Sequence, residues 1–231
     1  MIGIIGAMEL EVSELTAAME DAKTYQQAGM KFVAGKLEGA DAVVVRSGVG
    51  KVNAAVCAQI LADRFEVQAI INTGIAGAVG LEVGIGDIVL STSAQQHDMD
   101  VVAFGYDLGV IPQQSCSDFP ADANLLQLAQ ACCAEFLPEV KLHTGRVVTG
   151  DVFVAKKEQK TLLRRQFNAA CTEMEGAAIA HAAWLNQIPY LVVRAISDNA
   201  DAGAVEDYPA FERQAAARSA KLVRSMLRRL A

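Results

Sequence analysis

Residues 190–198, YLVVRAISD, are the segment from which the fold of this 231-residue chain can be inferred. The run is apolar at nearly every position and rich in Val and Ile, which is typical of a strand that is covered on both faces. Similar short runs recur at residues 2–5, 42–45, 67–71, 87–90 and 145–148. We therefore predict buried strands at these places, the last of them over residues 190–196.

Segments with helical spacing of apolar residues separate these runs. They cover residues 9–19, 52–62, 124–135, 156–166 and 176–186, and a last helix is predicted over about residues 208–230. Strands and helices that alternate in this way are typical of α/β proteins. No linker, composition break or internal repeat divides the chain. We expect a single three-layer α/β domain, residues 1–231, with a mixed, mostly parallel, twisted central sheet flanked by helices.

The composition limits the class of protein. Apolar residues make up 52% of the chain and charged residues 20%, so we expect a thick buried core and no disorder. The longest apolar runs are shorter than the roughly 18 residues of a membrane span. The net charge of −7 argues against a nucleic-acid partner. Because the first residues also lack the features of a signal peptide, we expect a cytoplasmic protein without a membrane partner.

The cysteines and histidines do not predict a structural or metal site. The five cysteines are odd in number and have no CxxC spacing, so they are interpreted as small buried residues of a reduced compartment. His97-Asp98-Met99-Asp100 lacks both the HExxH spacing and a second nearby histidine. We expect no metal.

Glycines and polar residues follow several of the predicted strands, at residues 6–8, 46–51, 72–77, 149–154 and 197–199. In α/β sheets, ligands bind beyond the carboxyl ends of the strands. Residues 48–51 do not complete a P-loop, so we reject a nucleoside triphosphatase. Residues 74–77 do not match GxGxxG, so a dinucleotide-binding site has little support. Glycine exposes backbone N–H groups, which would suit a sugar or a small anion.

Two acidic residues, Glu173 and Glu175, interrupt an apolar stretch just before the predicted helix 176–186. Burying an ionised carboxylate costs several kcal/mol unless charges or hydrogen bonds compensate, so the pair could hold a ligand with hydroxyl groups. Alternatively, both carboxylates could interact with the positive end of the helix that follows. These residues alone leave both interpretations open.

Asp198 and Glu11 are two further candidate acids. Asp198 ends a predicted buried strand, where partial desolvation would raise its pKa and allow it to act as a general acid. It could instead be an aspartate that forms a turn. Glu11 lies in the first turn of the predicted helix 9–19, where acidic residues commonly interact with the helix dipole.

Six ordered motifs connect these acids to a known family. They are MELEV at residues 8–12, NTGIAG at 72–77, HDMDV at 97–101, GDVF at 150–153, EME at 173–175 and VRAISD at 193–198. In these motifs the chain resembles the bacterial 5′-methylthioadenosine/S-adenosylhomocysteine nucleosidases of the nucleoside phosphorylase superfamily. The resemblance runs from Ile2 to about Asp201, and it implies a nucleoside phosphorylase-like fold.

The resemblance also implies an activity. The enzyme would hydrolyse the N-glycosidic bond of methylthioadenosine and S-adenosylhomocysteine, and also of 5′-deoxyadenosine, without a cofactor. Asp198 would protonate N7 of the leaving adenine, and Glu11 would orient and deprotonate the attacking water. Glu11, Glu175 and Asp198 must then lie around one cavity.

The remaining implied site residues bind the nucleoside substrate, some of them across a homodimer interface. Met174 and Glu175 would hold the ribose hydroxyls, and the main chain at Phe153 and Val154 would read the adenine edge. The implied substrate-binding residues are Met8, Ala76, Gly77, Phe153, Val154, Met174, Glu175 and Ser197. The residues implied to reach the partner subunit's site are Val101, Phe104, Tyr106 and Pro112.

One position departs from the family pattern, because family members often carry Ser where this chain has Ile75. A hydroxyl near the nucleophile is therefore missing, which could alter substrate preference. A phosphate-dependent purine nucleoside phosphorylase would also suit the motifs, with Arg46 and Arg194 as possible phosphate ligands. The same motifs are compatible with an aminodeoxyfutalosine nucleosidase or with a non-catalytic adenosine-binding sensor.

Overall fold

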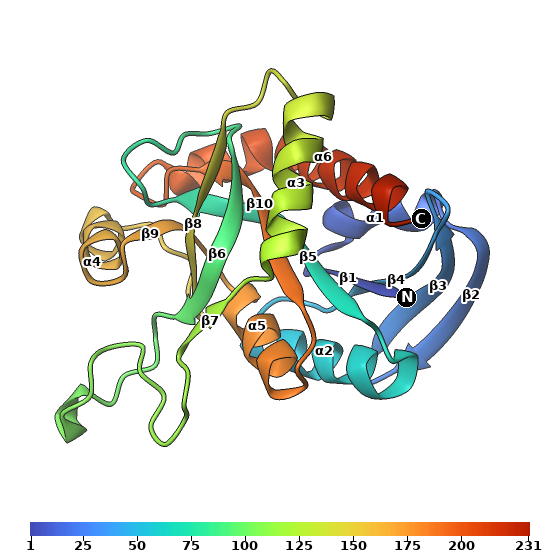
Figure 1. Ribbon diagram of the computed structural model, residues 1–231. Coiled ribbons are helices and arrows are strands. Elements are labelled where there is room, and N and C mark those ends of the chain that lie inside the picture. Colours follow the sequence, from blue (N-terminus) through green and yellow to red (C-terminus); the bar gives the residue numbers. More distant parts are fainter.

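The structure of the protein is a computed structural model that describes all residues from 1 to 231 (Figure 1). The strands are β1 (Ile2–Gly6), β2 (Glu20–Gln27), β3 (Met30–Leu37), β4 (Ala40–Arg46), β5 (Ala69–Ala78), β6 (Ile88–Gln96), β7 (Asp118–Pro120), β8 (Leu142–Thr149), β9 (Ala169–Glu173) and β10 (Tyr190–Asp198). The helices are α1 (Glu9–Ala17), α2 (Lys51–Phe65), α3 (Ala123–Phe136), α4 (Lys157–Phe167), α5 (Gly176–Leu185) and α6 (Ala204–Leu230), with a 3₁₀ turn, η1 (Val102–Phe104).

Strand β5 is the centre of the sheet, and all of its residues are buried. Its first half pairs with β1, its length pairs with β10, and its last two residues pair with β9. Strands β10, β6, β8, β9 and β5 therefore close into a ring. Strands β1, β4, β3 and β2 continue from β5 as an open extension of the same sheet.

The predicted α/β class and mixed sheet are confirmed, but the sheet is not mostly parallel. The strand pairs β10–β6, β5–β9, β6–β7, β2–β3 and β3–β4 are antiparallel, which is as many as the parallel pairs. The tight turns that join β2 to β3 and β3 to β4 permit only antiparallel neighbours. Strand β2, EDAKTYQQ, is almost wholly exposed, so it lacks the apolar run by which buried strands were predicted.

Helices cover both faces of the sheet (Figure 1). Helices α1, α3 and α6 bury one apolar cluster against it, and α2 and α5 bury a second cluster of the same size on the opposite face. Helix α4 packs beside β8 and β9 over a third, smaller cluster. No helix combines the length and the apolar character that a membrane crossing requires.

Several predicted boundaries differ from those of the structure. Strand β5 continues through the glycine-rich residues 72–77, which were expected to follow a strand over residues 67–71. Its neighbours on both sides supply ladder partners there, so the glycines remain extended. Helix α6 begins at Ala204, four residues before the predicted start, and the expected irregular stretch 98–123 contains η1 and β7.

Candidate active site

A cavity of about 210 Å³ lies where β1, β5, β9 and β10 end. Glu11, Glu175 and Asp198 all line this cavity, although they lie far apart in the sequence. The three acids that were expected around one cavity therefore do meet there. The other lining residues are Ala7, Met8, Val49, Ile75, Ala76, Gly77, Phe153, Thr172, Glu173, Met174, Ser197 and Tyr208.

Glu11 is held by backbone amides on both of its carboxylate oxygens. Oε2 accepts hydrogen bonds from the amides of Ala7, at 2.7 Å, and Met8, at 2.9 Å, and Oε1 accepts one from Ile75, at 3.1 Å. Burial raises the pKa of Glu11, against the lowering effect of Arg194 and of these hydrogen bonds. A buried carboxylate with a raised pKa is a stronger base than an exposed one.

Asp198 ends β10, where it both forms a turn and lines the cavity. Its Oδ1 accepts a hydrogen bond from the amide of Ala200 at 2.8 Å, which is a turn-forming contact, and its Oδ2 accepts one from Ser197 Oγ at 2.9 Å. The carboxyl group also lines the cavity, and burial raises its pKa. The turn therefore orients an acid that faces the cavity.

Glycines on β5 make room for both acids. A Cβ atom on Gly74 would lie 2.5 Å from Glu11 Oε1, and one on Gly77 would lie 2.7 Å from Asp198 Oδ1. Side chains at these two positions would displace the carboxylates. This close approach explains why the site requires glycine within a buried strand.

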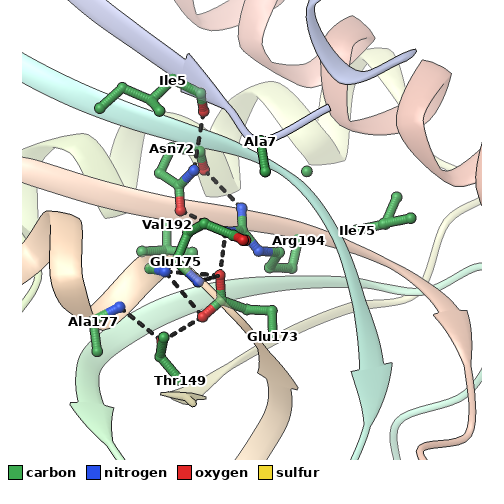
Figure 2. A network of polar contacts seen from close by, with 12 residues as sticks. Ile5, Ala7, Asn72, Ile75, Thr149, Glu173, Glu175, Ala177, Val192 and Arg194 are labelled. Carbon is green, nitrogen blue, oxygen red and sulfur yellow. Dashed lines mark hydrogen bonds and ion pairs between the residues drawn. The ribbon is translucent and has the colours of Figure 1, made fainter. Parts of the chain in front are cut away.

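The two acids ahead of α5 have different roles. Glu173 accepts hydrogen bonds from the amides of Glu175 and Gly176, which are the free backbone N–H groups at the start of α5. It also forms an ion pair with Arg194 at 2.5 Å (Figure 2). Glu175 instead accepts one hydrogen bond, from the amide of Gly50 at 2.8 Å, and faces the cavity. Burial, aided by the charge of Glu173, raises the pKa of Glu175 to about 8.

Neither arginine that was considered as a phosphate ligand lies in the cavity. Arg194 is fully buried, and its Nη2 atom donates to Asn72 Oδ1 and Glu173 Oε2, both at 2.5 Å. Arg46 lies on the surface, 3.4 Å from Glu9. The cavity is therefore lined by acids without a basic side chain.

Comparisons with known proteins identify the family. The family model of the Phosphorylase superfamily matches residues 1–228. The 5′-methylthioadenosine/S-adenosylhomocysteine nucleosidase of Shewanella loihica is 43% identical over 231 residues, covering 99% of both chains. The chain belongs to the nucleosidase family of this superfamily.

Solved structures of other family members share the fold. The nucleosidase of Neisseria meningitidis, in complex with methylthio-immucillin-A, has a TM-score of 0.94 and 36% identity, covering 99% of this chain and 98% of that chain. The nucleosidase of Colwellia psychrerythraea 34H, in complex with adenine, has a TM-score of 0.93 and 40% identity, covering 98% of this chain and 93% of that chain.

Within this nucleosidase-family fold, the motif HDMDV contributes a clamp. Lys51 Nζ lies 2.7 Å from Asp98 Oδ1, and Asp98 Oδ2 accepts a hydrogen bond from the amide of Asp151 at 2.9 Å. Asp151 Oδ1 in turn accepts one from the amide of Lys51 at 2.8 Å. The clamp ties the start of α2 to the segment that carries Phe153 into the cavity.

Not every implied site residue lines the cavity. The side chain of Val154 is buried in the cluster under α4, where it packs with Phe167 and its neighbours. Its expected contact with adenine, which involves the main chain, stays a prediction. Val101, Phe104, Tyr106 and Pro112 lie in the loop that projects from the body of the chain (Figure 1). They do not line this chain's own cavity, and Phe104 is 83% exposed.

Tyr208 is a site residue that sequence reasoning missed. It enters the cavity from α6, where its hydroxyl donates to Met8 Sδ at 3.2 Å. Its ring packs edge-on against Phe153 with 5.8 Å between the ring centroids. An aromatic residue near a helix start carries no signal that separates a site residue from a core residue, so only the tertiary contacts reveal it.

Replacing Glu175 by Gln should change the pH dependence of stability. Since the pKa of Glu175 is raised from its ordinary value of 4.5 to about 8, its contribution to stability is complete below pH 4.5 and is lost as the pH rises toward 8. Gln cannot ionise, so Glu175→Gln should be roughly 1–3 kcal/mol more stable than the native chain near pH 8. Denaturant unfolding near pH 4.5 and pH 8 measures this difference.

The matched control is Glu82→Gln, which changes an exposed glutamate. This control should follow the native chain at both pH values. A Glu175→Gln variant that loses stability with pH in parallel with the native chain would contradict the assignment.

Proposed function

We propose that the chain hydrolyses the N-glycosidic bond of 5′-methylthioadenosine and S-adenosylhomocysteine, and also of 5′-deoxyadenosine. The products are adenine and the corresponding ribose derivative. The observation that carries this proposal is that Glu11, Glu175 and Asp198 surround one cavity, with burial raising the pKa of each. Membership of the nucleosidase family and the adenine held by the Colwellia relative support it.

The reaction needs a general acid next to the adenine and a general base next to the attacking water. As the bond between C1′ and N9 breaks, its electron pair moves into the adenine, which takes a proton at N7 from Asp198. Water attacks C1′ and loses a proton to Glu11. The bond breaks through an oxocarbenium-like state, in which positive charge develops on the ribose.

Glu175 would contribute most as that positive charge develops. In the free chain its pKa of about 8 favours the protonated form at neutral pH. A neighbouring cation favours the ionised form, which can attract the oxocarbenium ion and accept a hydrogen bond from a ribose hydroxyl. Glu175 would then bind the transition state more tightly than the substrate, which accelerates the reaction.

The charge of the cavity favours hydrolysis over phosphorolysis. Four carboxyl groups line it, from Glu11, Glu173, Glu175 and Asp198, and no arginine, lysine or histidine does. A phosphate dianion would find no cationic partner there, whereas sites for phosphate usually provide arginine or other strong donors. Ile75 adds an apolar wall, while its backbone amide is already bonded to Glu11.

Purified protein should release adenine from methylthioadenosine in phosphate-free buffer, because water is the nucleophile. Liquid chromatography of adenine, with and without added phosphate, measures this activity. The rate should not increase with phosphate. Release that strictly requires phosphate and yields a ribose 1-phosphate would overturn the hydrolase proposal.

Asp198→Asn should lower kcat by about 10²–10⁴, because a positioned general acid typically contributes this much. Asn keeps the size of the side chain and can still accept the hydrogen bond from Ala200, so the melting temperature should change little. Asp41→Asn, which changes an exposed aspartate on β4 outside the cavity, is the matched control and should keep the native kcat. A near-native kcat in Asp198→Asn would remove the residue from this role.

We also propose a homodimer in which the loop with Val101, Phe104, Tyr106 and Pro112 reaches the partner's site. The projecting loop and exposed apolar side chains on α2 support it, since contiguous exposed apolar surface commonly marks an interface. Sedimentation equilibrium at micromolar concentration should give twice the chain mass of 24.5 kDa. A species with the mass of one chain would contradict this proposal.

A further inference from the structure

A second cleft, of about 710 Å³, adjoins the active-site cavity. The two share Ala7, Met8 and Val49 as lining residues, so a ligand can extend from one into the other. The cleft opens between α1, the turn from β2 to β3, and the start of α2. Unlike the cavity, it is lined by side chains of both charges, namely those of Glu9, Lys31 and Arg46.

Helix α1 contributes one face to the active-site cavity and another face to the cleft. Glu11 points toward β5 and bonds the Ile75 amide, whereas Glu9, Val12 and Thr16 line the cleft. Residues three and four positions apart lie on the same side of a helix, and residues two apart do not. Two acids of one helical turn therefore serve different sites.

Arg46 and Glu9 form a loose pair at the rim of this cleft. Arg46 ends β4 opposite Gly6 of β1, which places it beside the start of α1. Its Nη1 atom lies 3.4 Å from Glu9 Oε2, and the two side chains are 56% and 69% exposed. Such an exposed pair contributes little by itself, about 0–1 kcal/mol, so a ligand can replace it at little cost.

Apart from its 3.4 Å ion pair with Glu9, the guanidinium of Arg46 has no polar partner within the chain. Arg194, by contrast, bonds Asn72 and Glu173, and Arg146 bonds Asp118. A guanidinium with free donors can bind a carboxylate through two parallel hydrogen bonds. The neighbouring Glu9 carboxylate can accept a hydrogen bond from an ammonium group.

We propose that this cleft binds a zwitterionic amino acid group carried on the 5′ sulfur of the substrate. Arg46 would hold the α-carboxylate and Glu9 the α-ammonium. This inference rests on the proposed function and deepens it, because it assigns residues to the part of S-adenosylhomocysteine that methylthioadenosine lacks. The two opposite charges lie side by side, as they do in the ligand.

The order of groups along the cavity supports this direction. Asp198 acts at the base, and Glu11 and Glu175 act at the ribose. The lining residues that remain at the shared boundary are Ala7, Met8 and Val49, which suit the 5′ carbon and a thioether sulfur. Beyond them, Met30 and Val33 offer apolar surface for the methylene groups of the amino acid chain.

The test compares two substrates in one variant. In Arg46→Gln, the ratio of kcat/KM for S-adenosylhomocysteine to kcat/KM for methylthioadenosine should fall about tenfold, which corresponds to about 1.4 kcal/mol. Glu9→Gln should lower the same ratio, because it removes the ammonium partner. Arg165→Gln, an exposed arginine on α4 outside both sites, is the matched control and should keep the native ratio.

A third substrate separates a carboxylate contact from an indirect effect. The decarboxylated analogue, 5′-(3-aminopropylthio)-5′-deoxyadenosine, keeps the amine and lacks the carboxylate. The ratio of kcat/KM for this analogue to kcat/KM for methylthioadenosine should be the same in Arg46→Gln and in the native chain.

The outcomes separate this inference from the proposed function. An unchanged substrate ratio in Arg46→Gln would overturn the amino acid subsite, and so would an equal loss for all three substrates. If the native chain cleaved neither methylthioadenosine nor S-adenosylhomocysteine, the proposed function itself would fall.

Discussion

The buried ion pair between Arg194 and Glu173 is the interaction on which the rest of the structure depends (Figure 2). It joins β10 to the end of β9, and its further hydrogen bonds reach Asn72 of β5 and Thr149 of β8. Asn72 in turn donates to the carbonyl of Ile5 on β1 at 3.0 Å. One network therefore ties the closed ring of strands to the open extension of the sheet. Loss of either charged partner would leave an unpaired charge in the core, at a cost of about 3–5 kcal/mol.

The same network prepares the cavity. Because Glu173 is paired with Arg194 and bonded to the start of α5, its neighbour Glu175 is left to face the cavity. The positive charge of Arg194 also reaches Glu11, where it opposes the larger effect of burial on the pKa. The cavity therefore keeps acids with raised pKa values and adds no cation that a phosphate could bind.

Function also constrains the backbone of β5. A buried strand normally gains stability from large side chains, yet Gly74 and Gly77 lie where β5 passes closest to Glu11 and Asp198. Apolar packing is given up at these positions in favour of room for two carboxylates. The strand keeps its extended form because β10 and β9 supply its hydrogen-bond partners.

The sequence alone determined the α/β class and most of the buried strands and helices, because burial and helical spacing leave local patterns. The acids Glu11, Glu175 and Asp198 were selected through the resemblance of their motifs to the nucleosidase family. The local pattern around Glu173 and Glu175 could not distinguish these two acids, since the partners of each, Arg194 and the amide of Gly50, arrive from distant segments. The closure of the ring, the exposed strand β2 and the entry of Tyr208 were likewise decided only by the tertiary structure. Each depends on contacts between residues far apart in the chain, and such contacts leave no trace in local periodicity.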